Sequence, residues 1–389
     1  LREHIVDKPT QLFPDLVFCG EMQINPTMKY PVGSSAGYHG DQSLIYPHNK
    51  IQLMPYPTGK IGVPKNVYST GSITVPTFIN RNAGIKAEKD HKIAALIVVP
   101  WDNAAGYQVR QIHWINDSFV DMGCEVFADG RIENAPPATT LNFGDLHSEK
   151  MDYESLDRAC KIAIDLGAKT VVCHDTFDFT SRNHHNTANH LFIAAQGQTS
   201  IADDLAQAGD VLSIIGEQMA ADQILIVRSN HDEALDRWMT ERNYDFRQDP
   251  INARLYLDLQ SEAYRFIEEG QKVPDMFKVG LDTAEVSYPD SCVFLTRQEQ
   301  TLSPNGIRLD MHGDSGNNGS RATPKQLSTT YDALTTGHTH QGSIYGGCYT
   351  AGVTGLLDMG YNTRSGGGSG WSQCHVVEYY NGSRAVIAL

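Results

Sequence analysis

The sequence predicts an α/β protein in two parts, a layered α/β domain over residues 139–389 preceded by a mostly β domain over residues 1–138. In the first part, short runs rich in β-branched and aromatic residues, such as SITVPTFI, KIAALIVVP and YQVRQIHWI, are separated by Gly, Pro and Asn clusters. Pro136 and Pro137 mark the boundary, because tandem prolines interrupt both helices and central strands. In the second part, apolar strands alternate with helical patterns, which is typical of a sheet covered by helices.

The elements of the second part follow one another in a regular order. TTLNFGDLH and KTVVCHD are predicted strands that end in polar loops, and QILIVRSNHD repeats this pattern. Helices are predicted over residues 153–166, 199–220 and 251–269, and the first of these places Leu156, Ala159, Cys160, Ala163 and Ile164 on one face. SCVFLTR and GIRLDMHGD are further predicted strands, TTGHTH is a loop, and the chain ends in a hairpin around Asn381 and Gly382.

Composition and charge exclude several classes of protein. No apolar run approaches the roughly 18 residues that cross a bilayer, so an integral membrane protein is excluded. Of the formal net charge of −15, residues 1–140 carry −1 and residues 141–389 carry −14. A broad basic surface for nucleic acid is therefore not expected in the second part, whereas an acidic segment can collect divalent cations. The 7 cysteines are scattered without a C-x-x-C pair, which suits a reducing, cytoplasmic compartment.

Five short polar motifs each close one of the predicted strands. They are Asp145-Leu146-His147, His174-Asp175-Thr176-Phe177-Asp178, Asn230-His231-Asp232, His312-Gly313-Asp314 and Gly337-His338-Thr339-His340. Polar residues at strand ends form the sites of open α/β sheets, so these side chains are expected to meet. Imidazole and carboxylate ligands together favour Mn, Fe or Zn over Ca or Mg. The sequence therefore predicts a site for two metal ions.

The order D-x-H, D-x-x-D, N-H-D, H-G-D and G-H-x-H resembles the calcineurin-like metallophosphoesterase superfamily. The resemblance covers residues 141–389 and not the N-terminal part. It implies a layered β-sandwich flanked by helices and two divalent ions, with manganese favoured and Fe, Zn or Mg as alternatives. It also implies that Asp145, His147 and His340 hold one ion, that Asn230, His312 and His338 hold the other, and that Asp175 bridges them.

The resemblance assigns catalytic roles as well. His231 would stabilise the phosphoryl transition state or protonate the leaving oxygen, Asp232 would orient His231, and Asp178 would hold His231 or a ligand in place. His174 departs from the family, which usually has Gly before the bridging Asp, and this leaves the role of His174 open. Arg182, His184 and Arg228 are candidates for contacting substrate, although a solvated loop around His184 explains that stretch equally well.

The second motif indicates which class of substrate the resemblance favours, namely DNA. H-D-T-F-D-F-T, with Phe177 between two carboxylates, is similar to the corresponding motif of SbcCD-type DNA repair nucleases. The β-rich N-terminal part and the 82-residue interval between Asn230 and His312 together resemble, more loosely, the pre-early host-DNA-degrading nucleases of tailed phages, which would place the protein in the host cytoplasm. The leading hypothesis is a manganese-dependent deoxyribonuclease acting on DNA, in a homo-oligomer if it assembles as those nucleases do. The alternatives are a phosphatase or phosphodiesterase of a small molecule or phosphoprotein, and a binding protein in which the metal only stabilises the fold.

Overall fold

A six-stranded sheet at the centre of the molecule carries the candidate site. The computed structural model describes residues 4–33, 37–59, 61, 63–101, 106–182, 199–219, 221–242, 244–362 and 367–389. The order of the sheet is β14 (Cys292–Phe294), β13 (Gln223–Ile226), β12 (Thr170–Cys173), β11 (Thr140–Asn142), β18 (Cys374–Glu378) and β19 (Arg384–Ala388). The first four strands are parallel, and β18 and β19 form the predicted antiparallel hairpin.

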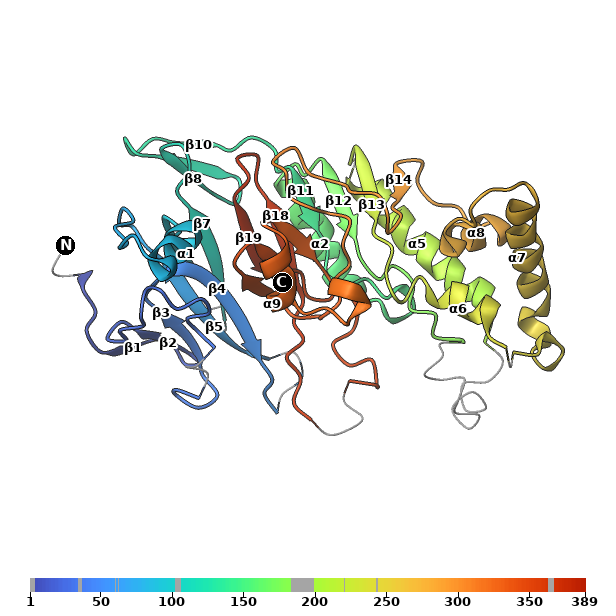
Figure 1. The fold of residues 1–389 in the computed structure, drawn as a ribbon, viewed down its shortest axis with the longest axis horizontal. Coiled ribbons are helices and arrows are strands. Elements are labelled where there is room, and N and C mark those ends of the chain that lie inside the picture. Colours follow the sequence, from blue (N-terminus) through green and yellow to red (C-terminus); the bar gives the residue numbers. More distant parts are fainter. Residues whose placement is uncertain are drawn as a thin grey trace.

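Helices cover one face of this sheet. They are α2 (Tyr153–Asp165), α5 (Ile201–Met219), α6 (Ala234–Thr240), α7 (Pro250–Glu268) and α8 (Met276–Thr283). Val171 and Cys173 of β12 point into the core beneath them, as the period of two in a strand requires. Figure 1 shows α5, α7 and α8 at one end of the molecule and the N-terminal strands at the other, with this sheet between them.

The predicted face of α2 is buried with one exception. Leu156, Ala159, Cys160 and Ala163 are at most 1% exposed, whereas Ile164 is 52% exposed. At 3.6 residues per turn, Ile164 lies about 80° from Leu156, at the margin of the apolar stripe, so its side chain faces solvent. The helix begins at Asp152, whose side chain accepts hydrogen bonds from the N–H groups of Glu154 and Ser155.

An eight-stranded sheet covers the other face. Its order is β1 (Pro9–Phe13), β2 (Leu16–Cys19), β3 (Ser43–Tyr46), β5 (Lys65–Gly71), β4 (His48–Tyr56), β16 (Ser343–Tyr345), β17 (Cys348–Thr350) and β15 (Leu334–Thr336). Strand β4 pairs with β16, where Leu53 lies opposite Ile344. The N-terminal part therefore shares one sheet with the C-terminal part, and the division at residue 138 stays a prediction.

Apolar residues from both sheets fill the space between them. Leu53 and Ile344 of the eight-stranded sheet pack in one cluster with Val376 of β18 and Val386 of β19. Each of these side chains is at most 5% exposed. Burying a side chain of this size stabilises the fold by about 1.5–3 kcal/mol, so this layer contributes substantially to stability.

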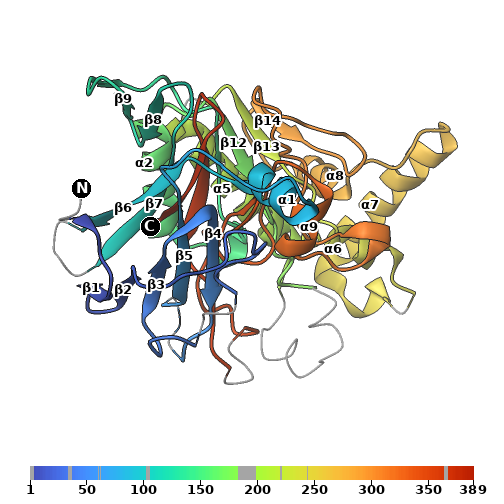
Figure 2. The same ribbon diagram turned by 60° about the vertical axis from the view of Figure 1, so that its left-hand side comes forward.

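Smaller elements complete the fold. They are the hairpin β6 (Ala94–Pro100) and β7 (Tyr107–His113), the three-stranded sheet of β8 (Ser118–Asp121), β9 (Cys124–Phe127) and β10 (Ile132–Asn134), the helices α1 (Asn82–Asp90) and α9 (Pro324–Thr330), and the 3-10 turns η2 (Ser148–Lys150), η3 (Phe246–Gln248) and η4 (Asn317–Gly319). Lys89 of α1 pairs with Asp332, two residues after α9, at 2.9 Å, although the sequence separates them widely, and Figure 2 shows the two helices one in front of the other. No helix among the described residues is long and apolar enough to cross a membrane.

Two predicted strands do not form. Ile73 and Val75 of SITVPTFI are 83% and 75% exposed, and Pro76 in the middle of this run lacks the N–H that a strand ladder needs. GIRLDMHGD makes only isolated bridges, such as that between Arg308 and Leu334. The predicted strands around residues 94–100 and 107–113 do form, as β6 and β7.

Candidate metal centre

The motifs at the strand ends come together in one buried cluster. Asp145 follows β11, Asp175 follows β12 and His340 follows β15, and each is at most 5% exposed. His312 lies in an irregular segment, and its carbonyl accepts a hydrogen bond from the N–H of Gly337 at 2.8 Å. This bond ties the H-G-D segment to the G-H-x-H loop, although the two belong to different parts of the sequence.

The first group of possible metal ligands consists of Asp145, His147, Asp175 and His340. Their ligand atoms all lie within 4.8 Å of one another. The Nε2 atoms of His147 and His340 are 2.9 Å apart, and Nε2 of His340 is 3.1 Å from Oδ2 of Asp145. Imidazole nitrogens and carboxylate oxygens that converge in this way are able to hold a divalent ion.

The second group consists of Asp175, His312 and His338, again within 4.8 Å of one another. Oδ2 of Asp175 is 3.2 Å from Nε2 of His312 and 3.7 Å from Nε2 of His147. Asp175 therefore belongs to both groups, the position expected of a bridging carboxylate. Asn230 lies in the loop after β13, and its buried Oδ1 has no hydrogen-bond partner in the described part of the chain.

Unpartnered polar atoms gather in this cluster. Among the described residues, Oδ1 of Asp175, Oδ1 of Asp145, Nδ1 of His340 and Nδ1 of His312 are buried without a hydrogen bond. Leaving such a group unpaired costs about 1–3 kcal/mol. A bound cation would satisfy these atoms, so the residues present fit a metal site.

The backbone at this site is strained. His147, Asp175, His338 and His340 have φ angles of 49°, 42°, 73° and 54°, in the left-handed region that side chains other than glycine rarely occupy. Such residues cost about 1–3 kcal/mol each and concentrate at ligand sites. The sharp turns direct both polar side chains of the D-x-H motif, and both histidines of the H-x-H motif, into the same cluster.

Burial determines the protonation of the histidine ligands. Burial lowers the pKa of His340 to about 3 and that of His338 to about 4. Both imidazoles are thus neutral near pH 7, the form that binds a metal. Burial, followed by the charge of Asp175, raises the pKa of Asp145 to about 6. Two carboxylates held this close without a cation repel each other.

Asp178 connects a possible ligand to His231. Its Oδ1 lies 2.9 Å from Nδ1 of His147 and 3.2 Å from Nδ1 of His231. Burial lowers the pKa of His231, but the charges of Asp175 and Asp178 outweigh it and bring the pKa to about 10. Asp178 thus occupies the holding position that the resemblance assigns to it.

The expected contact between Asp232 and His231 is replaced by another. Oδ1 of Asp232 accepts a hydrogen bond from the N–H of Phe177 at 3.0 Å, and its backbone N–H bonds the hydroxyl of Ser229. The carboxylate of Asp232 therefore stabilises the loop after β12, and the carboxylate that contacts His231 is that of Asp178. The reason is that Asp232 begins the turn into α6, which directs its side chain back towards β12.

The candidate substrate residues have partners within the protein. Arg182 is 8% exposed and makes two hydrogen bonds to Asp249, at 2.6 and 2.7 Å. Arg228 pairs with Glu233 and Asp236 at 2.9 and 3.2 Å. This geometry favours a structural role for both arginines, and substrate contact stays a prediction. His184 lies outside the described residues.

Several residues beside the cluster escaped the sequence analysis. The carboxylate of Glu149 accepts the backbone N–H groups of Asp178 and Phe179, each at 2.8 Å. Arg237 on α6 donates to the backbone carbonyl of Asn230 and is exposed. No motif marks Glu149 or Arg237, because only the fold brings them to the site. His174, whose role the sequence leaves open, is fully buried beside the ring of His312, with both nitrogens unpartnered in the described part of the chain.

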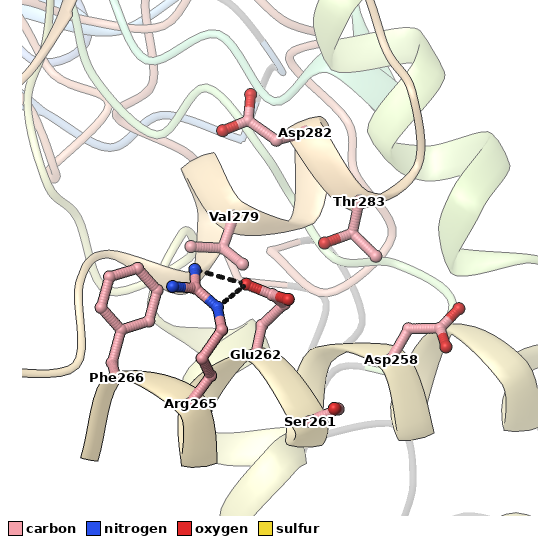
Figure 3. Close-up of a pocket in the computed structure, with 8 residues that line it drawn as sticks. All are labelled: Asp258, Ser261, Glu262, Arg265, Phe266, Val279, Asp282 and Thr283. Carbon is pink, nitrogen blue, oxygen red and sulfur yellow. Dashed lines mark hydrogen bonds and ion pairs between the residues drawn. The ribbon is translucent and has the colours of Figure 1, made fainter. Parts of the chain in front are cut away.

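A separate hollow lies between α7 and α8. It has a volume of about 480 Å³, and Figure 3 shows Glu262 and Arg265 paired side by side on α7, with Asp282 on the opposite helix. None of its lining residues belongs to the candidate metal centre. The chemistry is therefore expected at the strand ends and not in this hollow.

Comparison with known proteins identifies a relative. No protein-family model and no solved structure matches the chain. Protein A1 of Escherichia phage T5 is 39% identical over 387 residues, an alignment that covers 95% of this chain and 67% of the relative. This similarity supports a phage origin. Because the identity extends over nearly the whole chain, the protein belongs to the family of phage T5 protein A1.

Proposed function

We propose that the protein is a metal-dependent phosphodiester hydrolase of the calcineurin-like type, a manganese-dependent deoxyribonuclease that acts in the host cytoplasm. The observation that carries the proposal is the sharing of Asp175 between two groups of histidine and aspartate ligands. A pair of divalent cations held there would acidify a water molecule and neutralise the charge of a phosphodiester.

The side chains of the protein divide the remaining work. Asp145, His147 and His340 would hold one cation, Asn230, His312 and His338 the other, and Asp175 both. Asp178 holds Nδ1 of His231, which directs the other ring nitrogen away from Asp178. The His231 imidazolium can then stabilise charge on the phosphoryl group or give its proton to the leaving oxygen.

DNA as the substrate has separate support. The second motif, with Phe177 between Asp175 and Asp178, is similar to that of DNA repair nucleases, and the chain belongs to a phage protein family. The net charge of −15 predicts weak binding of DNA without metal, because two polyanions repel each other. Metal binding would remove part of that repulsion where the phosphate lies.

A cleavage assay tests this proposal. Linear and circular DNA would be incubated with the protein in Mn²⁺, in Mg²⁺ and in EDTA, and His231→Ala would be compared with His39→Asn, a change at an exposed residue far from the motifs in sequence. Cleavage is expected in Mn²⁺ for the wild type and for His39→Asn, and not in EDTA. Efficient hydrolysis of p-nitrophenyl phosphate with DNA left intact would instead favour a phosphatase.

A further inference from the structure

Two aromatic rings lie beside the metal centre in the segment between β17 and β18. The ring of Trp371 makes an edge-to-face contact with that of His340, with centroids 4.1 Å apart and planes at 73°. The ring of Tyr361 contacts Trp371 in turn, with centroids 5.7 Å apart. A chain of rings thus leads from a candidate metal ligand towards the surface.

Exposure increases along this chain of rings. His340 is 5% exposed, Trp371 is half-buried and Tyr361 is 48% exposed. The hydroxyl of Tyr361 contacts the thioether of Met359 at 3.3 Å. Tyr361 is therefore about half exposed, beside a site that is otherwise buried.

Backbone hydrogen bonds fix the position of Trp371. The N–H of Ser372 donates to the carbonyl of His340 at 3.0 Å, and the N–H of Trp371 donates to the hydroxyl of Ser369 at 3.2 Å. The backbone of Trp371 is therefore attached to the loop of His340, and its ring contacts the ring of His340. A fixed aromatic ring loses little conformational entropy when another ring stacks on it.

The chemistry of the two rings indicates which kind of ligand group they suit. Burial raises the pKa of Tyr361, and the charges of Asp178, Asp175 and Asp145 raise it further. The Tyr361 ring is therefore uncharged near pH 7, and its aromatic face suits a flat base. Base stacking on aromatic side chains is independent of sequence, because every base has a π-face.

We propose that Tyr361 and Trp371 form a stacking surface for one nucleobase of the substrate, on the side of the centre built by Asp145, His147 and His340. This inference rests on the proposed function and deepens it, because it requires a substrate with an unpaired base next to the scissile phosphate. Single-stranded DNA and frayed duplex ends provide such a base without the cost of breaking a base pair.

Two oligonucleotides with the same backbone test the proposal. One is a thymidine 12-mer, and the other carries abasic tetrahydrofuran residues in place of the nucleotides around the cleaved phosphate. The values of kcat and KM in Mn²⁺ would be measured for the wild type, Tyr361→Ala, Tyr361→Phe, Trp371→Phe and Tyr264→Ala. Tyr264 on α7 is 59% exposed and lines no part of the metal centre, so it is the matched control.

The stacking surface predicts a loss that depends on the base. Tyr361→Ala is expected to reduce kcat/KM on the thymidine 12-mer about tenfold or more and to leave the abasic oligonucleotide unchanged. Tyr361→Phe, Trp371→Phe and Tyr264→Ala should keep most of the activity. If Tyr361→Ala lowered kcat/KM equally on both oligonucleotides, or on neither, the inference would be overturned and the nuclease assignment would stay intact. Failure of the wild type to cleave either one would overturn both.

Discussion

At the residue scale, the candidate centre depends on the close approach of the Asp145 carboxylate to the backbone of Gly337 as much as on the chemistry of its ligands. A Cβ atom at Gly337 would lie 2.1 Å from Oδ1 of Asp145 and 2.9 Å from Cβ of His174. Only glycine leaves room for the carboxylate here. The G-H-x-H motif therefore supplies, beside its two histidines, the space that Asp145 occupies.

Gly337→Ala should accordingly displace Asp145 and impair the site. A ligand displaced by about 1 Å can cost on the order of 100-fold in activity, so we expect a loss of that size together with weaker Mn²⁺ binding. Cleavage rates and calorimetric titration with Mn²⁺ would measure both. Gly123→Ala is the control, because a Cβ there meets nothing within 4 Å. Equal activity of the two variants would contradict this account of Gly337.

The residue types of the site were predictable, and the contacts among them were only partly so. Histidine and aspartate at five predicted strand ends pointed to a metal centre, because strand ends in such sheets converge. The choice of Asp178 over Asp232 as the partner of His231 depends on how two loops turn, which sequence spacing does not determine. Tyr361 and Trp371 lie in no motif and reach the site through tertiary contacts alone.

At the element scale, the beginning of α6 belongs to a network of partly buried charges beside the metal centre. Arg228 pairs with Glu233 and Asp236, and Arg297 pairs with Glu233 and Asp314. Oδ2 of Asp236 is buried without a partner in the described part of the chain. Burial raises the pKa of Asp236 to about 7, although the charge of Arg228 opposes the shift.

This shift predicts how stability depends on pH. The folded protein binds a proton at Asp236 more tightly than the unfolded chain does, so the contribution of Asp236 is fully present below about pH 4. That contribution is lost as the pH rises towards about 7. Asp236→Asn should weaken this decline in the free energy of unfolding by about 1–3 kcal/mol. Urea denaturation from pH 4 to pH 8 would measure it, with the exposed Asp210→Asn as control. Identical pH profiles for wild type and Asp236→Asn would contradict the prediction.

Secondary structure was predicted best where local pattern and burial agree. The continuous apolar runs of β12 and β13 and the helices α2, α5 and α7 match the predictions to within a few residues. The run SITVPTFI has the composition of a strand, but Pro76 and the absence of a covering layer leave its side chains exposed. Pairing between β4 and β16 joins residues almost 300 positions apart, and no local pattern specifies such a register.

At the scale of the whole molecule, the two parts of the chain share a sheet and a core. Strand β4 continues the sheet through β16, and the cluster between the sheets contains Leu53 from the first part and Val376 from the second. A structure joined in this way is expected to unfold as one cooperative unit. The N-terminal part would then be required for a stable metal centre.

Calorimetry of the whole chain would test this cooperativity. We expect a single unfolding transition. Leu53→Ala should lower the free energy of unfolding by about 2–5 kcal/mol, because a cavity forms between the sheets. Because EDTA would remove any cations that the buried carboxylates bind, we expect it to lower the same transition. Two separate transitions, of which Leu53→Ala shifts only one, would show that the parts fold independently.

The central claim is that a centre of two cations works together with His231 to cleave DNA. Its most direct test measures manganese content and DNA cleavage on the same purified samples of the wild type and His231→Ala. The account predicts about two Mn²⁺ per chain in both proteins and cleavage slower by at least about 100-fold in the variant, because the proposal places His231 at the phosphoryl group and not among the ligands. Wild-type protein that cleaves DNA without bound metal, or His231→Ala that cleaves at the wild-type rate, would contradict it.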